Sequence, residues 1–465
     1  MTHPQYFPTA DICERALAAR DARFDGIFYV GITSTGVYCR PVCPSRFATS
    51  NHRRFFPSAA SAEDAGFRPC LRCRPELAPG HGPMDALPHL AAAAATRIAA
   101  GALNGHTVAH LAADLGVSER HLRRAVERAI GVSPIALAQT HRLLLAKQLL
   151  ADTSLPVTQI AFASGFQSLR RFNAMFRERY RLSPTAVRRP REAPSRSNDL
   201  IRLTLGYRPP LAWDALIALL EGSILPGAET ITPHRYARTV RLDACTGVVV
   251  VENAPAPKAH LTVDVSPSLL PALMPLLARL RRLFDLDAEP TVVDAHLAQT
   301  GLAEQVAERP GLRVPGAFDG FEVALAQLLR TGPERLGRHV VAHLGEPIAT
   351  DTPGLAYLAP GASRVAEAGA ACLRALGAPR HLADSIERVA HAVATGALRL
   401  EPGTDAAAAR RTLTTVAGLD DRFATTIVMR ALHWPDAFPT SGHPPRARAE
   451  SWRPWRAYAA LHLGI

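Results

Sequence analysis

The chain has 465 residues, of which 48% are hydrophobic and 20% are charged, which fits two to four globular domains and excludes a disordered chain. No stretch has the roughly 18 uninterrupted apolar residues of a membrane span. Residues 1–25 mix acids, bases and prolines and lack the apolar core of a signal peptide. We therefore expect a cytoplasmic protein with no membrane partner.

Positive charge is concentrated in the first two-fifths of the chain. The formal net charge is +12; residues 1–190 hold 24 Lys and Arg against 13 Asp and Glu, and the remaining residues hold 29 against 28. This asymmetry is typical of a polyanion-binding surface, and DNA or RNA is the default polyanion. A basic surface that only keeps the protein soluble is the alternative.

The pattern of residues changes several times along the chain. Aromatic and β-branched runs and five of the seven cysteines lie before a Pro-Gly-rich break at 79–83, and helical periodicity follows it. A polar, Pro-rich stretch at 190–198 precedes alternating segments typical of strands, at 200–205, 239–242, 247–251 and 261–265. From about residue 286 the pattern is helical. We predict a multidomain α+β chain with domains at 1–80, 85–190, 200–285 and 286–465.

Four cysteines form two close pairs, Cys39 with Cys43 and Cys70 with Cys73, in the pattern C-x3-C…C-x2-C with 26 residues between the pairs. In a reducing compartment such pairs indicate a metal site rather than disulfides. Two pairs bring four thiolates to one tetrahedral centre, the arrangement that Zn²⁺ prefers. The other cysteines, Cys13, Cys245 and Cys372, are isolated, and we expect them to be small buried residues.

The residues around both pairs are more specific than the spacing. GITSTGVYCRPVCPSR (31–46) and AGFRPCLRCRPE (65–76) closely resemble the N-terminal zinc domain of the Ada family, over roughly residues 8–77. The resemblance implies a small α/β zinc domain in which zinc-bound Cys39 accepts the methyl group of a DNA methylphosphotriester, once per molecule. It also implies contacts to the DNA backbone by Thr35, Arg46, Arg68 and Arg72. A purely structural zinc is the alternative.

Methyl transfer would also change the charge of the centre. Four thiolates on Zn²⁺ carry a formal charge near −2, and methylation of one makes it about −1. Because phosphate contacts dominate affinity for DNA, we expect this step to strengthen DNA binding by roughly tenfold.

Residues 85–190 contain two similar helix-turn-helix units about 50 residues apart. The first runs through Val108–Ser118 into a helix at 119–130, with a Gly at the turn and Ser118 as helix N-cap; the second runs through Val157–Phe166 into another Arg-rich helix. The long helix 134–150 joins them. GFQSLRRFNAMFRERYRLSP (165–184) resembles the AraC-type DNA-binding domain, which is all-α.

In such domains the second helix of each unit enters the major groove. The residues expected to face DNA are Arg120, Arg123, Arg124, Ser168, Arg170, Arg171 and Asn173. The resemblance implies double-stranded DNA as partner, at methylated backbone and promoter sites, and RNA polymerase as the partner of an activator. It also implies a nucleoid-associated location.

The remaining residues resemble the AlkA-type 3-methyladenine glycosylases. Residues 200–285 resemble the N-terminal sheet-and-helix domain, and 286–465 the all-α catalytic domain with its helix-hairpin-helix; RPGLRVPGAFDGFEVAL (309–325) and SWRPWRAYAALHL (451–463) are the clearest stretches. The family hairpin reads Pro-Gly-Ile-Gly-Pro-Trp-Thr-Ala, whereas this chain reads AGLDDRFA at 417–424. Asp420 and Asp421 thus stand where backbone N–H groups should bind phosphate.

The catalytic Asp of that family follows an Ala-Phe-Pro element, and here Gly442 occupies its position. Glycosidic cleavage needs a carboxylate against the sugar, and glycine has none. Asp436 and Glu450 are the nearby substitutes, although nothing in the sequence places them correctly. We therefore expect weak or absent base excision.

The sequence predicts a zinc-dependent methylation sensor that activates transcription of alkylation-repair genes and carries a glycosylase-like tail. Two alternatives remain: an active 3-methyladenine glycosylase whose front half targets it to DNA, and a zinc-containing transcription factor without methyl transfer. A Pro-Cys-His-Arg element is absent from the sequence, so we do not expect a guanine-repair methyltransferase domain.

Overall fold

A computed structural model describes residues 7–45, 47–80, 89–188, 200–255, 257–439 and 446–465. The chain divides into two compact units, one of residues 1–208 and 256–278, the other of residues 209–255 and 279–465. Both units combine helices with strands, which confirms the multidomain α+β class. No helix of the described ranges is long and apolar enough to cross a membrane.

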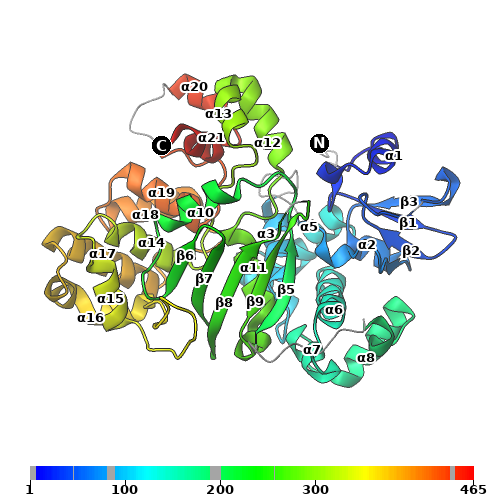
Figure 1. The fold of residues 1–465 in the computed structure, drawn as a ribbon, viewed down its shortest axis with the longest axis horizontal. Helices are drawn as coiled ribbons and strands as arrows, with labels where there is room; N and C mark the ends of the chain where they lie inside the picture. Colours follow the sequence, from blue (N-terminus) through cyan, green and yellow to red (C-terminus); the bar gives the residue numbers. More distant parts are fainter. Residues whose placement is uncertain (1–6, 46, 81–88, 189–199, 256, 440–445) are drawn as a thin grey trace. The chain divides into compact units, whose positions relative to one another are not determined.

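The N-terminal module is built on a small sheet with strand order β3-β1-β2-β4 (Figure 1). Strand β1 pairs antiparallel with β2 and with β3, and β2 pairs parallel with β4. Gly31 in β1 lies between the rings of Phe56 and Phe67, where a Cβ would approach them to 2.8 and 2.9 Å, so this position requires glycine. The elements of the module are α1 (Ala10–Ala19), β1 (Tyr29–Ile32), β2 (Val37–Cys39), β3 (Arg53–Phe56), α2 (Ala59–Asp64), β4 (Arg68–Pro69) and the 3-10 helix η3 (Pro75–Leu77).

Two helix-turn-helix units follow, as the sequence predicts. Ser118 caps α5 by accepting a hydrogen bond from the backbone N–H of His121, and Ser168 caps α8 by accepting one from Arg171. Gly116 and Gly165 adopt positive φ values of 70° and 86° at the two turns. The helices are α3 (His89–Ala99), α4 (Val108–Asp114), α5 (Glu119–Ile130), α6 (Pro134–Asp152), α7 (Val157–Ala163), α8 (Leu169–Tyr180) and α9 (Pro184–Val187).

An aromatic column holds the second helix-turn-helix unit together. Phe166, Phe172, Phe176 and Tyr180 form successive ring contacts with centroids 5.1, 5.5 and 4.6 Å apart, and all four are buried. Three of them are spaced four residues apart along α8, so they share one helix face and leave the opposite face polar.

The segments between residues 200 and 265 in which apolar and polar residues alternate form strands. In the first unit β5 (Ile201–Gly206) pairs antiparallel with β9 (His260–Val265). In the second unit β7 (Arg235–Leu242) pairs antiparallel with β6 (Glu229–Thr232) and with β8 (Cys245–Asn253). Strand β6 was not predicted, because it is short and only partly buried and therefore lacks a clear apolar alternation.

The rest of the second unit is helical. Its main apolar core lies among α14, α15, α16, α17, α18 and α19, and a second core surrounds the fully buried Trp452. The helices are α10 (Trp213–Glu221), α12 (Pro290–Leu297), α13 (Ala303–Glu308), α14 (Gly320–Leu329), α15 (Leu336–Leu344), α16 (Ala362–Ala375), α17 (Arg380–Ala394), α18 (Ala406–Thr415), α19 (Asp421–Ala431), α20 (Arg446–Glu450) and α21 (Arg456–Leu463). Helix α11 (Leu273–Leu283) follows β9 along the chain.

Truncation of the aromatic column should destabilise the second helix-turn-helix unit. Phe176→Ala removes a fully buried ring from a closed stack, and such a cavity costs roughly 3–5 kcal/mol. Faster amide exchange throughout α7 and α8 is the expected result. Phe162→Ala is the matched control, since this ring on α7 is 52% exposed. Equal exchange in the two variants would contradict the assignment of the core.

Candidate metal centre and nucleic-acid interface

The parallel pairing of β2 with β4 brings the two cysteine pairs together. Tyr38 stands opposite Pro69 in the register, so the next residues, Cys39 and Cys70, leave the same end of the sheet side by side. Cys43 and Cys73 then lie on the loops that continue from these strands. The C-x3-C and C-x2-C spacings allow each loop to turn back toward the first cysteine of its pair.

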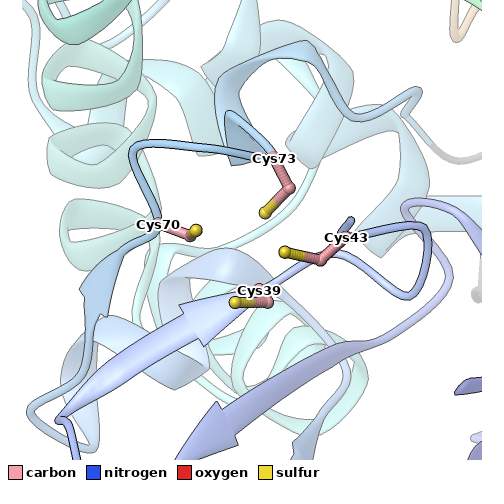
Figure 2. Close-up of side chains that lie close together, drawn as sticks. All are labelled: Cys39, Cys43, Cys70 and Cys73. Carbon is pink, nitrogen blue, oxygen red and sulfur yellow. The ribbon is translucent and has the colours of Figure 1, made fainter. Parts of the chain in front are cut away.

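All four sulfur atoms point toward a common centre (Figure 2) and lie within 4.8 Å of one another. All four residues are buried, from 0% exposure for Cys43 to 7% for Cys70 and Cys73. In a tetrahedral Zn–S4 centre the sulfurs are about 3.8 Å apart, given a bond of roughly 2.3 Å. The donor set and its convergence therefore fit zinc, as the sequence predicts.

Hydrogen bonding among the sulfurs shows why this cluster needs a cation. Hydrogen bonds with Cys39 and with Cys73 lower the pKa of Cys43 to about 6 although the bond with Cys70 opposes them, and bonds with the other three cysteines hold the pKa of Cys70 below its usual range. The pKa of Cys39 is raised because its thiol donates to the other sulfurs. Four sulfurs this close cannot all lose their protons together, because the negative charges would repel one another, unless a positive charge lies between them.

Backbone N–H groups reach two of the sulfurs. The N–H of Arg40 donates to Cys73 Sγ over 3.4 Å, and the N–H of Arg72 donates to Cys70 Sγ over 3.4 Å. Among the described residues, none outside the cluster donates a hydrogen bond to Cys39 Sγ. Hydrogen bonds withdraw charge from a thiolate, so these donors make the sulfurs of Cys70 and Cys73 less electron-rich.

The sequence does not reveal the role of Arg40. Its guanidinium pairs with the buried carboxylate of Asp25 and donates to the Cys73 carbonyl over 3.1 Å. Arg40 thereby ties the two cysteine loops to the turn before β1. The only signal in the sequence was a charged residue between two ligands, and the partner Asp25 lies 15 positions away.

The predicted backbone contacts differ in accessibility. Thr35 is exposed at the turn between β1 and β2, Arg72 is exposed between the two ligands of its loop, and Arg68 is half-buried on β4. Arg46 lies outside the described residues. Thr35, Arg68 and Arg72 thus belong to the strands and loops that carry the cysteines, and the accessible guanidinium of Arg72 suits a phosphate.

The predicted residues of the helix-turn-helix units lie on α5 and α8 or at their caps. Arg120, Arg124, Arg170 and Arg171 are exposed and form no ion pair within the described part of the chain. Arg123 is half-buried and pairs with Glu119 over 2.5 Å, an i,i+4 pair that contributes only about 0.3–0.5 kcal/mol. The hydroxyl of Ser168 caps its helix, and Asn173 is half-buried.

The hairpin of the glycosylase-like unit lies between α18 and α19. The Asp420 carboxylate accepts a hydrogen bond from the Phe423 N–H over 2.8 Å, which caps α19, and Asp421 pairs with Arg410 over 3.2 Å. The backbone donors that would meet a phosphate at this helix N-terminus therefore already face a carboxylate of the chain itself.

Asp436 and Glu450, the acids that the sequence suggests as substitutes for the catalytic Asp of the family, are both engaged by arginines. Asp436 accepts from Arg456 over 2.7 and 2.9 Å and pairs with Arg453, and its side chain is 12% exposed. Glu450 pairs with Arg453 over 2.6 Å and with Arg456 over 3.2 Å. Gly442 lies outside the described residues.

Three family models match the chain. One described as the metal binding domain of Ada matches residues 12–76, a helix-turn-helix domain matches 111–190, and the AlkA N-terminal domain matches 202–319. These matches confirm the three resemblances that the sequence motifs indicate.

Relatives extend the match over the whole chain. The probable bifunctional transcriptional activator/DNA repair enzyme AlkA of Mycobacterium tuberculosis (strain H37Rv) is 35% identical over 479 residues, which cover 97% of this chain and 95% of that protein. DNA-3-methyladenine glycosylase 2 of Escherichia coli is 31% identical over 278 residues, covering 56% of this chain and 95% of the relative. The bifunctional transcriptional activator/DNA repair enzyme Ada of E. coli is 31% identical over 147 residues, covering 31% and 40%.

The fold, the four-cysteine centre and these matches define a chain in which an Ada-type metal-binding module and a helix-turn-helix domain precede an AlkA-like domain. It belongs to the family of the mycobacterial bifunctional transcriptional activator/DNA repair enzyme AlkA.

Loss of one cysteine ligand should release the metal. We expect Cys43→Ser to reduce the zinc content from about one ion per chain to a small fraction, because a closed structural centre requires all four donors. Cys13→Ser is the matched control: burial raises the pKa of this thiol to about 11, and it donates to the Pro8 carbonyl, so it stays protonated. Metal analysis of both purified proteins checks this, and zinc loss from Cys13→Ser alone would contradict it.

Proposed function

We propose that this protein is a single-turnover methylphosphotriester–DNA methyltransferase and a transcriptional activator of alkylation-repair genes. The four converging sulfurs carry this proposal, because a thiolate held in a metal centre is a nucleophile at neutral pH without a general base. We propose domains at residues 1–80, 85–190, 200–285 and 286–465, with the reactive centre in the first and promoter binding in the second.

The reaction is a displacement at the methyl carbon. A new S–CH3 bond forms while the CH3–O bond of the triester breaks, and the electron pair of that bond stays on oxygen. The products are an S-methylcysteine and an ordinary phosphodiester anion, so no proton moves. Zinc, when bound, would keep the sulfurs deprotonated before the reaction. A thioether is a poor leaving group and the proposed reaction includes no step that restores the thiolate, so each molecule would react once.

Cys39 is the proposed methyl acceptor, with Cys43, Cys70 and Cys73 as the other zinc ligands. Solvent exposure does not distinguish it, since Cys39 is 5% exposed and all four lie between 0% and 7%. Hydrogen bonding distinguishes Cys39 from the other three. The sulfurs of Cys70 and Cys73 accept hydrogen bonds from backbone N–H groups. The pKa of Cys43 is lowered chiefly by its hydrogen bond with Cys39, and a hydrogen bond with Ser45 also lowers it.

The proposed DNA interface combines contacts to the DNA phosphate backbone with helices that enter the major groove. The residues that we assign to it are Thr35, Arg46, Arg68 and Arg72 at the metal module and Arg120, Arg123, Arg124, Ser168, Arg170, Arg171 and Asn173 at the helix-turn-helix units. Loss of one negative charge at Cys39 would reduce repulsion from phosphate, which strengthens promoter binding. An activator bound in this way would act on RNA polymerase.

Intact mass of the zinc-loaded protein tests the transfer. After incubation with duplex DNA that carries one methylphosphotriester, we expect the mass to increase by one methyl group and then to stop. Cys39→Ala should show no increase, because the reactive sulfur is gone.

Cys372→Ala is the control for general thiol alkylation, since this half-buried cysteine lies in the other compact unit. A mass increase that persists in Cys39→Ala would assign the methyl group elsewhere. No increase in the wild type would leave a zinc-containing transcription factor.

For the AlkA-like tail we propose weak or absent base excision. The hairpin N-terminus is capped by Asp420, and Asp436 and Glu450 are both held by arginines, so neither is a free carboxylate for an oxocarbenium-like transition state. The alternative function is an active 3-methyladenine glycosylase, and the 31% identity to the E. coli glycosylase favours it.

An abasic-site assay separates these two functions. On duplex DNA that contains 3-methyladenine, we expect the protein to release base no faster than buffer alone, because arginines hold both Asp436 and Glu450. Robust release by the wild type would establish the glycosylase. In that case Asp436→Asn and Glu450→Gln would show whether either carboxylate carries the reaction.

A further inference from the structure

The first compact unit includes a segment of the AlkA-like region. Strands β5 and β9 belong to this unit together with the metal module and the helix-turn-helix units. Helix α6 contacts β5, and the Gln148 amide of this helix donates to the Thr204 carbonyl of β5 over 2.8 Å. Strand β5 also contacts η3, the 3-10 helix that follows the ligand Cys73. These AlkA-like strands therefore pack directly on elements that surround the metal centre.

The end of β5 lies too close to the metal module to accept a side chain. A Cβ at Gly206 would stand 2.3 Å from the Leu77 carbonyl oxygen of η3, so backbone meets backbone at this point. A Cβ at Gly26 would stand 2.1 Å from the Pro79 carbonyl oxygen and 3.3 Å from Arg208 Nη2. Three segments that are far apart in the sequence thus meet at one junction, which contains Gly26, Leu77, Pro79, Gly206 and Arg208.

The guanidinium of Arg208 is buried in this junction. The residue is 2% exposed; its Nε donates to the Asp25 carbonyl over 3.0 Å, and its Nη2 donates to the Gly80 carbonyl over 2.8 Å. A buried charge is costly unless hydrogen bonds satisfy it. These two bonds therefore restrict where the turn at Asp25 and the segment at Gly80 can lie.

The turn that Arg208 holds is also bonded to the cysteine loops. The Asp25 carboxylate accepts from Arg40, whose guanidinium donates to the Cys73 carbonyl over 3.1 Å. The backbone N–H of Arg40 donates to the Sγ atom of Cys73 over 3.4 Å. Gly80 lies on the segment that leaves the Cys73 loop through η3. Arg208 is thus connected to the metal centre both through hydrogen bonds and along the chain.

We propose that Arg208 is a positioning residue of the metal centre, and that through it the AlkA-like strands hold the cysteine loops in the zinc-binding arrangement. Replacement of residues that orient metal ligands from outside the coordination shell changes metal affinity by roughly 10–100-fold. The AlkA-like region thereby has a role in zinc retention that is independent of base excision. This role requires zinc in the four-cysteine centre and does not depend on methyl transfer to Cys39.

Zinc release tests the role of Arg208 in the full-length, zinc-loaded protein. A chromogenic chelator in excess measures the rate at which zinc leaves. We expect Arg208→Met to release zinc roughly tenfold faster than the wild type, because the Asp25 and Gly80 carbonyls lose their donor. Co²⁺ in place of zinc gives a second measurement: the d–d absorption bands of the folded variant should shift, since the cysteine loops are no longer held in the same geometry.

Arg202→Met is the matched control, because it is the same substitution on the same strand. The Arg202 side chain is 61% exposed and pairs with Asp264 of β9 over 2.7 Å. This variant should keep the wild-type release rate and the wild-type cobalt spectrum. A release rate and a spectrum of Arg208→Met equal to those of the wild type would overturn the proposal.

Hydrogen exchange of the wild type tests the same coupling without any variant. Coupling between two sites is reciprocal, so removal of zinc should loosen the strand that Arg208 anchors. We expect amide exchange in Ile201–Gly206 to accelerate at least about fivefold after zinc removal, and exchange in α17 of the other compact unit to stay unchanged. Unchanged exchange in β5 would overturn the proposal even if Arg208→Met did not fold. Failure of methyl transfer alone would overturn the proposed function and leave the role of Arg208 intact.

Discussion

Mutual repulsion among four sulfurs within 4.8 Å of one another is the constraint on which the N-terminal half depends. The module has several small apolar clusters rather than one large core, and in one of them the four cysteines pack with Leu17, Val30 and Ile32. A core of this size provides little stability, so a cation among the sulfurs contributes to folding as well as to reactivity. The proposed nucleophile is therefore also a structural ligand, and its chemistry cannot leave the fold of the module unaffected.

This dual role gives the buried polar contacts on α6 their significance. Glu63 binds the hydroxyl of Thr140, Glu76 binds the ammonium group of Lys147, and Asp152 binds the guanidinium of Arg74. Thr140 and Lys147 are almost completely buried. Buried ion pairs contribute little net stability, since desolvation offsets their attraction, but removal of one partner is costly. Removal of Glu63, Glu76 or Asp152 would therefore leave a polar group of α6 or of the module buried without its partner.

Much of this arrangement could be predicted from the sequence. The cysteine spacing and the flanking motifs predicted the zinc ligands, and Ser118, Gly116 and Gly165 marked the helix-turn-helix boundaries, because caps and left-handed turns are local requirements. The parallel pairing of β2 with β4 was not predictable, since two strands of three and two residues have no readable alternation.

The buried contact between Glu63 and Thr140 was equally unpredictable from the sequence. Glu63 and Thr140 are 77 residues apart, and each is an ordinary polar residue on a helix when viewed locally. Cys245 and Cys372, expected to be buried, are only half-buried, because an isolated cysteine gives no periodic signal of which way it faces. The roles assigned to Cys39 and to the arginines remain predictions, since they depend on a substrate that the fold alone does not contain.

In the AlkA-like tail, the residues that stabilise the fold differ from the residues that a glycosylase reaction would require. Its apolar cores are complete: Ile427, Val428 and Trp452 are fully buried, and the helices on both sides of the hairpin are intact. Helix packing depends on these apolar faces and is indifferent to the charge of an exposed hairpin. Phosphate binding and glycosidic cleavage depend instead on a few polar groups. At the hairpin a carboxylate meets the helix N-terminus, and at the predicted catalytic edge two arginines neutralise the two nearby acids. The architecture of such a domain and its chemistry therefore depend on different residues, and identity to a glycosylase reports the first more directly than the second.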